Sequence, residues 1–341
     1  MTPRAPSAPR PAGPLRRALR RALRPVPAAA LACAVTGCGL VSGSPMNDAV
    51  EPGTAGRGKP LEGAELTVTS KEFTEQIILG QIMGLTFKAA GASVVDRTSI
   101  QGTIGAREAV RSGTADGMYE YTGTAWITHL GRTKPLVDPD EQWRAVRSAD
   151  RKNGISWLPQ SSLNNTYALA VNDTFQKKYK VRTLSDVARL ARSDPSQVTL
   201  CVESEFASRE DGLPGMQKAY GMKIPASQVR KMSGGVVYTQ AAKGSSCHFG
   251  EVFTTDGRIK ELGLNVLEDD RNFFPNYNAA PEIRTSTLEE YPAIAQVLAP
   301  VTKALDNDVA RELNAKVDVD GEDPHKVAKD WLLDEGLIKE G

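Results

Sequence analysis

The sequence lacks the signatures of several protein classes. No stretch reaches the roughly 18 to 20 consecutive apolar residues that a membrane-spanning helix needs. There is no G-x-S-x-G elbow, no phosphate loop ending in Gly-Lys-Ser or Gly-Lys-Thr, no H-E-x-x-H and no G-x-G-x-x-G. The three histidines, His129, His248 and His325, are far apart and without the spacing of metal ligands. We therefore expect a protein that is not an enzyme and that carries no cofactor and no metal.

Excess positive charge is also missing from most of the chain. The formal net charge is +1, but seven arginines and no acidic residue fall within residues 1–37. The rest of the chain holds 35 basic against 41 acidic residues. Because nucleic acid attracts a basic surface, we expect no nucleic acid partner. The length of 341 residues is enough for about two domains, and 40% apolar with 24% charged residues is typical of a globular protein.

Residues 1–37 have the order of a secretory signal peptide. Paired arginines precede a short apolar stretch that ends in small residues. The sequence V-T-G-C ending at Cys38 resembles a bacterial lipobox, in which the cysteine is acylated and becomes the new N-terminus. The alternative is an ordinary signal peptide in which Cys38 is incidental, and the export route, general or twin-arginine, stays open. We expect an exported lipoprotein, anchored through Cys38 to the outer face of the cytoplasmic membrane.

Residues 38–64 are rich in Gly, Pro and Ser and have no apolar periodicity. This composition predicts a flexible linker behind the lipid anchor. Beyond it only Cys201 and Cys247 remain, and an oxidising compartment would allow them to form a disulfide. Two separate buried thiols are the alternative.

From residue 65 onward, short β-rich runs alternate with amphipathic helical runs. This alternation predicts an α/β fold with a mainly parallel sheet. Capping boxes predict helices that begin at Asp138 with Glu141 and at Ser286 with Glu289. The alternation repeats independently from about residue 168 to 272, which predicts two lobes with a cleft between them, where ligands commonly bind.

Polar and aromatic residues gather where predicted strands end, which is where α/β folds place ligand contacts. The segments are S-K-E-F-T-E-Q at 70–76, E-Y-T-G-T at 120–124, N-N-T-Y at 164–167, E-F-A-S-R-E-D-G at 205–212, F-T-T-D-G-R at 253–258 and F-F-P-N-Y-N at 273–278.

With these motifs the sequence resembles the Opu and ProX type of substrate-binding proteins, which serve ABC importers of glycine betaine, carnitine, choline and related osmoprotectants. The resemblance covers residues 65–338 in collinear order. It implies a two-lobed class II periplasmic-binding-protein fold with a ligand cleft and two crossovers. Lobe one would comprise residues 65–165 plus 275–341, and lobe two residues 166–274. Implied partners are an ABC permease and, through it, a cytoplasmic ATPase, and we expect a monomer.

The resemblance also implies the ligand-binding residues. In this family aromatic rings enclose a quaternary ammonium, and polar or basic groups hold the ligand's carboxylate. The matching rings are Tyr121, Tyr167, Phe253 and Tyr277, and the matching polar residues are Lys71, Thr124, Arg209 and Gln76. Phe253 departs from the tyrosine that many members have, but a phenyl ring keeps the π face. Family members with an acid in place of Thr124 look tuned to choline, whereas a hydroxyl suits a betaine carboxylate.

Physical chemistry supports such a site. A trimethylammonium group has no N–H donor, so aromatic faces must hold it, at about 0.5 to 2 kcal/mol for each ring. A carboxylate favours a forked guanidinium and a hydroxyl. The alternative roles are core packing for the rings and solvated surface charges for Lys71 and Arg209. Other functions in view are a ligand-sensing module for small amines and an exported amine-acting enzyme, and the preferred osmoprotectant stays open.

Overall fold

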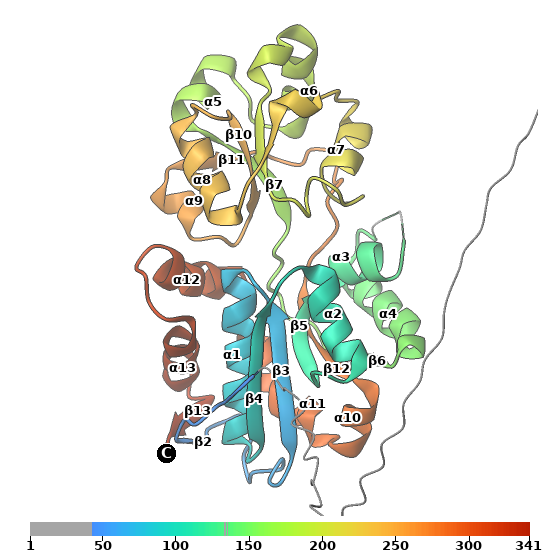
Figure 1. The fold of residues 1–341 in the computed structure, drawn as a ribbon, viewed down its shortest axis with the longest axis vertical. Helices are drawn as coiled ribbons and strands as arrows, with labels where there is room; N and C mark the ends of the chain where they lie inside the picture. Colours follow the sequence, from blue (N-terminus) through green and yellow to red (C-terminus); the bar gives the residue numbers. More distant parts are fainter. Residues whose placement is uncertain (1–42, 133, 135) are drawn as a thin grey trace, which may run out of the picture. The chain divides into compact units, whose positions relative to one another are not determined.

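The computed structural model describes residues 43–341, except residues 133 and 135 (Figure 1). The predicted signal peptide and lipid attachment site, residues 1–37 and Cys38, lie outside the described residues. In the described part of the chain, no helix is both long enough and apolar enough to cross a bilayer.

The first lobe is built on a six-stranded sheet of order β1-β4-β3-β5-β12-β6. β3 runs parallel to β4 and β5, whereas β1 is antiparallel to β4, and β12 is antiparallel to β5 and β6. The strands are β1 (Ser44–Pro45), β3 (Glu65–Lys71), β4 (Ser93–Ile100), β5 (Gly117–Tyr121), β6 (Ile155–Trp157) and β12 (Ala279–Arg284). A separate pair consists of β2 (Val50–Pro52) and β13 (Ile338–Glu340).

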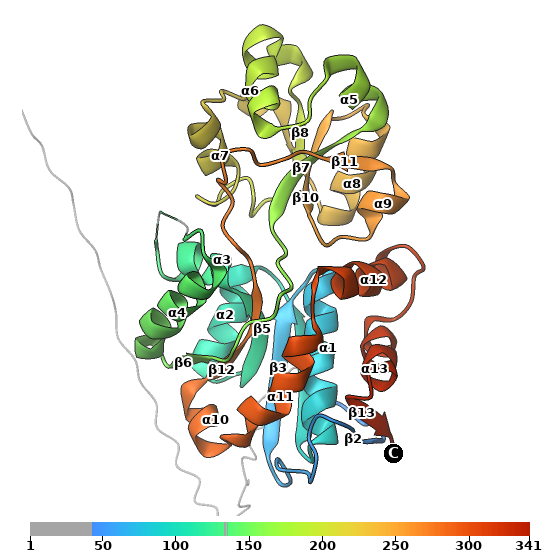
Figure 2. The same ribbon diagram turned by 180° about the vertical axis from the view of Figure 1, so that it is seen from behind.

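Helices of the first lobe come from both ends of the chain. They are α1 (Thr74–Ala89), α2 (Thr103–Ser112), α3 (Thr122–Thr124), α4 (Pro139–Asp150), α10 (Thr285–Glu290), α11 (Ala293–Ala304), α12 (Asn307–Asp318) and α13 (Pro324–Asp334). A π-helical turn, Ala125–His129, follows α3. The C-terminal helices α11, α12 and α13 all contact α1, which lies against β3 and β4 (Figure 2). Residues far apart in the sequence therefore complete this lobe.

The second lobe is built on a five-stranded sheet of order β11-β7-β10-β8-β9. β8 is parallel to β9 and β10, while β7 is antiparallel to β10 and β11. The strands are β7 (Tyr167–Asn172), β8 (Leu200–Val202), β9 (Val229–Lys231), β10 (Phe249–Phe253) and β11 (Leu264–Val266). The helices are α5 (Asp173–Tyr179), α6 (Leu184–Ser193), α7 (Leu213–Tyr220), α8 (Gly234–Lys243) and α9 (Arg258–Glu261).

Two segments connect the lobes, one between β6 and β7 and one between β11 and β12. They pair with each other through an antiparallel bridge between Asn164 and Asn278. The Asn165 N–H also donates to the Tyr277 carbonyl at 3.2 Å, and the Tyr277 N–H to Asn164 Oδ1 at 2.7 Å. The fold is therefore a two-lobed α/β fold with two crossovers, and the motif tyrosines Tyr167 and Tyr277 flank the paired segments.

Local sequence patterns explain where some helices begin. The Asp138 side chain accepts a hydrogen bond from the Glu141 N–H at 2.7 Å, and α4 starts with Pro139, as the capping box predicts. The second predicted capping box is wrong. α10 already begins at Thr285, after an Arg284 whose side chain caps nothing, because β12 runs directly into the helix.

Residues 43–64 differ from the flexible linker that their composition predicts. β1 pairs with β4 and β2 with β13, and the side chains of Met46, Val50 and Leu61 are buried in the first-lobe core. β4 and β13 would otherwise have unpaired strand edges, and the incoming chain satisfies them. A few apolar residues without periodicity are enough to hold this segment on the first lobe, because backbone pairing positions them.

Cys201 on β8 and Cys247, just before β10, are joined by a disulfide with their Cα atoms 5.7 Å apart. Both side chains are buried in the second lobe. The structure thus decides between a bridge and two thiols, which cysteine counting leaves open. The bond ties two adjacent parallel strands whose ends carry residues of the cavity described next.

Candidate functional site

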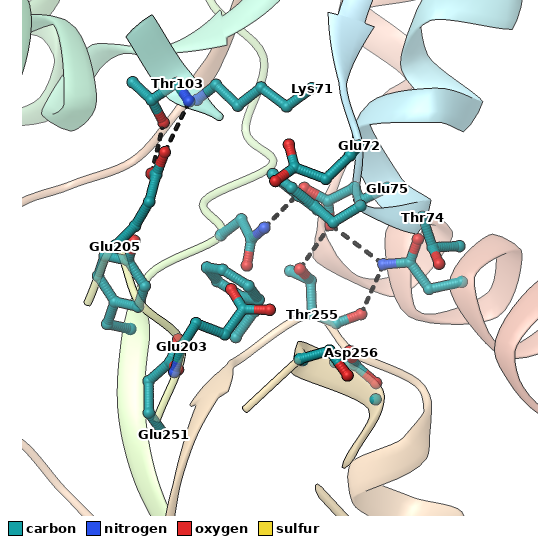
Figure 3. A pocket seen from close by; sticks show the side chains of 18 of the residues that line it. Lys71, Glu72, Thr74, Glu75, Thr103, Glu203, Glu205, Glu251, Thr255 and Asp256 are labelled. Atoms are coloured by element: carbon teal, nitrogen blue, oxygen red, sulfur yellow. Dashed lines mark hydrogen bonds between the residues drawn. The ribbon is translucent and has the colours of Figure 1, made fainter. Parts of the chain in front are cut away.

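A cavity of about 560 Å³ is lined by residues of both lobes and of the crossing segments (Figure 3). It lies where β3, β5 and β10 end, and where β7 begins. This volume falls within the range of about 300 to 1,000 Å³ that is usual for small-molecule sites. The cavity is therefore the first candidate for a ligand-binding site.

The four predicted aromatic residues, Tyr121, Tyr167, Phe253 and Tyr277, all line this cavity. The Tyr167 ring lies 5.1 Å from the Phe253 ring and 5.4 Å from the Tyr277 ring, centroid to centroid, and meets the latter edge to face. Tyr121 ends β5 in the first lobe, whereas Phe253 ends β10 in the second. The rings thus come from both sides of the cleft.

A fifth ring, Phe73, belongs to the same cluster and was missed. It stacks on Phe253 with centroids 5.3 Å apart and on Tyr121 at 6.3 Å, with interplanar angles of 13° and 17°. Phe73 immediately precedes α1, so the start of the helix turns its ring toward the cleft. Phe73 lies inside the motif at 70–76, which was the only indication in the sequence of a role at the site. The sequence does not show that its ring packs against Tyr121 and Phe253.

Lys71 lines the cavity, but its charge is neutralised inside the first lobe. Its Nζ lies 2.6 Å from Glu120 Oε1, and the two side chains are only 4% and 0% exposed. Burial alone would raise the pKa of Glu120, but the Lys71 charge and a hydrogen bond with His129 hold it at about 2. The ammonium also lies 5.0 Å from the centroid of the Tyr121 ring. Lys71 is therefore paired within the protein, which differs from the free carboxylate partner that the family motif implies.

Arg209 is also paired, through two hydrogen bonds to Asp211 of 2.8 and 2.5 Å. Its remaining guanidinium contacts are Glu205 at 3.4 Å and Thr124 Oγ1 at 3.4 Å, the latter on the first lobe. The guanidinium carbon lies 5.8 Å from the centroid of the Tyr167 ring. Arg209 and Thr124 are therefore neighbours across the cleft, as a shared ligand contact requires.

Gln76 does not line the cavity. Its Nε2 donates to the Tyr119 carbonyl at 3.0 Å, and its Oε1 accepts from the Lys71 N–H at 3.4 Å. The side chain thus joins β3 to β5 behind the site. The motif indicates a ligand contact here, whereas the structure gives Gln76 a role in positioning the strand that carries Lys71.

Glu75 is a further residue that the sequence reasoning missed. Its buried carboxylate accepts four hydrogen bonds of 2.5 to 3.1 Å. The donors belong to both lobes and to one crossing segment, namely Tyr121, Asn165, Thr255 and Asn314. Burial raises the pKa of Glu75, and the four bonds partly offset that rise. The Thr255 bond joins the second lobe to α1 across the cleft.

Acidic side chains line the cavity from both lobes, and those of the second lobe are Glu203, Glu205, Glu251 and Asp256 (Figure 3). Glu203 follows β8 and Glu251 lies in β10, and the Glu203 N–H donates to Glu251 Oε2 at 3.0 Å. Burial, followed by their mutual repulsion for Glu251, raises the pKa of both carboxyl groups. Glu205 reaches across the cleft to Thr103, with bonds of 2.7 Å to its N–H and 2.7 Å to its hydroxyl.

No metal centre accompanies these carboxylates. Within residues 43–341, leaving aside 133 and 135, no three His, Cys, Asp or Glu side chains are arranged to hold a metal ion. The histidines have other partners: His129 contacts Glu120, His248 the Gln197 carbonyl, and His325 both Gln81 and Asp48.

Comparison with known proteins identifies relatives of the whole body. A family model described as the substrate-binding domain of an ABC-type glycine betaine transport system matches residues 64–334. The glycine-betaine-binding protein of Pseudomonas aeruginosa is 36% identical over 281 residues, which is 81% of this chain and 89% of the relative. The glycine betaine-binding protein YehZ of Escherichia coli is 33% identical over 82% of this chain and 94% of its own.

A solved structure agrees with these matches. The crystal structure of a glycine betaine/carnitine/choline ABC transporter protein aligns with a TM-score of 0.64 at 25% identity. The alignment covers 79% of this chain and 96% of that one.

Proposed function

This chain belongs to the family of substrate-binding domains of ABC-type glycine betaine transport systems, and from that membership we propose that its cavity binds a small quaternary ammonium compound in a box of aromatic rings. The coarser function, a substrate-binding protein of an osmoprotectant ABC transporter, follows from the family. The ligand-binding residues and the ligand itself are our proposal.

Five aromatic rings cluster on one cavity, and this clustering is the main support for the proposal. Phe73, Tyr121, Tyr167, Phe253 and Tyr277 come from separate segments, yet they form one chain of neighbours with centroids 5.1 to 6.3 Å apart. A quaternary ammonium offers no N–H to a hydrogen-bond acceptor, so its recognition depends on such π faces. The nearby carboxylates add long-range attraction for a cation.

For a betaine, the carboxylate end would meet Thr124 and Arg209. The hydroxyl and the guanidinium lie 3.4 Å apart, and Arg209 retains N–H donors beyond those that face Asp211. Because Asp211 already compensates the guanidinium charge, this end provides directional hydrogen bonds more than net charge. Glycine betaine is the first ligand to test, followed by choline, carnitine and proline betaine.

In this proposal ligand binding closes the cleft, as in other two-lobed binding proteins. The moving bodies would be residues 65–165 with 275–341 and residues 166–274. The closed protein, exported and held to the membrane through Cys38, would deliver its ligand as a monomer to the permease and its cytoplasmic ATPase.

Calorimetric titration of the purified protein with these four ligands tests the proposal. We expect Tyr277→Ala to weaken binding by about 5- to 150-fold, because one ring contributes on the order of 1 to 3 kcal/mol. Tyr277→Phe should lose less, since only the hydroxyl bond to Asp211 Oδ2, 2.7 Å long, is removed. Tyr179→Ala, on the second lobe and outside the cavity lining, serves as the control. Unchanged affinity in a folded Tyr277→Ala protein would show that the rings do not hold the ligand.

A further inference from the structure

One part of the cavity wall, with Glu203 and Glu251, belongs neither to the five rings nor to the Thr124–Arg209 end. Glu203 follows β8, Glu251 lies in the middle of the neighbouring strand β10, and Glu251 is only 2% exposed. Glu251 Oε2 accepts the Glu203 N–H, whereas its other oxygen, Oε1, accepts no hydrogen bond from any described residue. The negative charge of Glu203 nearby makes a charge on the buried Glu251 unfavourable.

The cations of the cavity form their salt bridges with other carboxylates, and Arg209 and Arg258 attract Glu251 and Glu203 only from a distance. Lys71 is bonded to Glu120, and Arg209 to Asp211. The third cation, Arg258, is bonded to Asp256 and to Asp318. In the described part of the chain no lysine, arginine or histidine forms a salt bridge with Glu203 or Glu251. The compensating charge is therefore expected from outside the protein.

A second and independent observation comes from Asn165. Its side chain is 4% exposed and lines the same cavity. Its Nδ2 donates to Glu75 Oε1 at 2.9 Å, but its Oδ1 is buried and accepts no hydrogen bond among the described residues. A buried amide oxygen without a donor is unfavourable by about 1 to 3 kcal/mol. A ligand that donates a hydrogen bond to Asn165 Oδ1 would remove this cost.

These acceptors cannot be satisfied by the ligand group that the rings hold. A trimethylammonium has no N–H, and a carboxylate brings only acceptors. The cavity volume of about 560 Å³ leaves room for a ligand that extends beyond one methylated nitrogen. Because Glu251 is two residues before Phe253 on the same strand, both side chains emerge on one face of the sheet.

We propose that the ligand carries, beside its quaternary ammonium, a second cationic group with N–H donors, and that Glu251, Glu203 and Asn165 form the subsite for that group. This inference rests on the proposed function, because the rings must hold the quaternary ammonium first. The substrate class is thus a quaternary ammonium compound that also bears a primary or secondary amine or another N–H cation.

Three synthetic ligands test the subsite with the wild-type protein. (3-Aminopropyl)trimethylammonium and butyltrimethylammonium have the same number of heavy atoms, but only the first has a second cationic group with N–H donors. We expect the amine to bind about tenfold tighter or more, as one charge-assisted hydrogen bond provides. (3-Hydroxypropyl)trimethylammonium, a neutral donor, should fall between them. Glycine betaine is titrated alongside as the test of the ring box.

A variant pair assigns the effect to the subsite. Glu251→Gln keeps an acceptor for the Glu203 N–H but removes the charge, so the amine-to-butyl affinity ratio should fall to within about threefold. Glu261→Gln, an exposed residue at the end of α9, is the matched control and should keep the ratio.

The outcomes separate this inference from the proposed function. If glycine betaine or butyltrimethylammonium binds but the amine binds no tighter than the butyl compound, the subsite does not exist. If the hydroxyl compound equals the amine, the cationic part of the proposal is wrong. If the ratio survives in Glu251→Gln, the assignment to Glu251 is wrong. If no quaternary ammonium binds at all, the proposed function itself fails.

Discussion

Two pairs of charged residues at the cavity, Lys71 with Glu120 and Glu203 with Glu251, differ in how their charges are compensated. On the first-lobe side, the Lys71 ammonium and the Glu120 carboxylate neutralise each other at 2.6 Å. On the second-lobe side, Glu203 and Glu251 are neighbours of the same charge, and the pKa of both is raised. Compensated charges support the fold, whereas uncompensated ones reduce stability and commonly occur where a protein binds a ligand.

The largest expected effect is the loss of the compensated pair. Lys71→Met should lower the free energy of unfolding by about 3 to 5 kcal/mol, because Glu120 would remain buried without its cation. Urea denaturation measures the loss. Adding Glu120→Gln should recover most of it, since both charges are then removed. A loss below about 1 kcal/mol in the single variant would mean that the pair is not structural.

Urea denaturation at low pH tests whether the Lys71–Glu120 ion pair stabilises the folded state. Because the pKa of Glu120 is lowered to about 2 from an ordinary 4.5, the pair stabilises the folded state above the ordinary value. This stabilisation should disappear as the pH falls from about 4.5 toward 2. The double variant should lack this part of the pH dependence.

The second lobe contains a covalent bond between two of its strand segments, the Cys201–Cys247 disulfide. The disulfide closes a loop between residues 46 positions apart, so Cys201→Ser with Cys247→Ser should lower the free energy of unfolding by about 3 to 4 kcal/mol. Urea denaturation under non-reducing conditions measures it. Unchanged stability would indicate that strand packing alone holds β8 and β10 together.

The ring box can be tested on the residue that sequence analysis missed. Phe73→Leu keeps an apolar side chain but removes the π face between Tyr121 and Phe253, so choline or glycine betaine should bind weaker by about 2 kcal/mol at most. Phe175→Leu, which replaces a ring of the second-lobe core outside the cavity lining, is the control. If the two variants bind the ligand with equal affinity, the Phe73 ring does not contribute to ligand binding.

The smallest expected effect concerns the contact between the lobes. α2 has Gly102 as its N-cap and no cap from its own side chains, and Glu205 of the other lobe accepts the Thr103 N–H instead. Burial alone would raise the pKa of Glu205, but the Thr103 bonds hold it below its ordinary value. Glu205→Ala should destabilise the closed form by about 1 kcal/mol and weaken ligand affinity about fivefold.

The exposed neighbour Glu210→Ala serves as the control for that variant. X-ray scattering without and with ligand should show a more open unliganded protein only for Glu205→Ala. If neither affinity nor scattering changes, the bond forms without contributing to closure.

Much of the fold could be predicted from local patterns. The alternation of strands and helices and the start of α4 are confirmed. The mainly parallel sheet is wrong, because β12 pairs antiparallel with β5 and β6, and β7 with β10 and β11. The rings at the strand ends were nominated through family motifs, and all four line one cavity. The folding of residues 43–64 onto β4 and β13 was missed because backbone pairing leaves no mark on side-chain composition.

The sequence by itself determined which residue types stand at the ends of the strands, because periodicity and motifs are properties of neighbouring positions. Only the tertiary structure decided which charges meet. Lys71 and Glu120 are 49 positions apart, yet they form a buried ion pair. Glu203 and Glu251, 48 positions apart, become a like-charge pair only because β8 and β10 are adjacent in the sheet. Electrostatic energy depends on the distance between charges and on their burial in the folded protein, and neither can be read from the spacing of residues along the sequence.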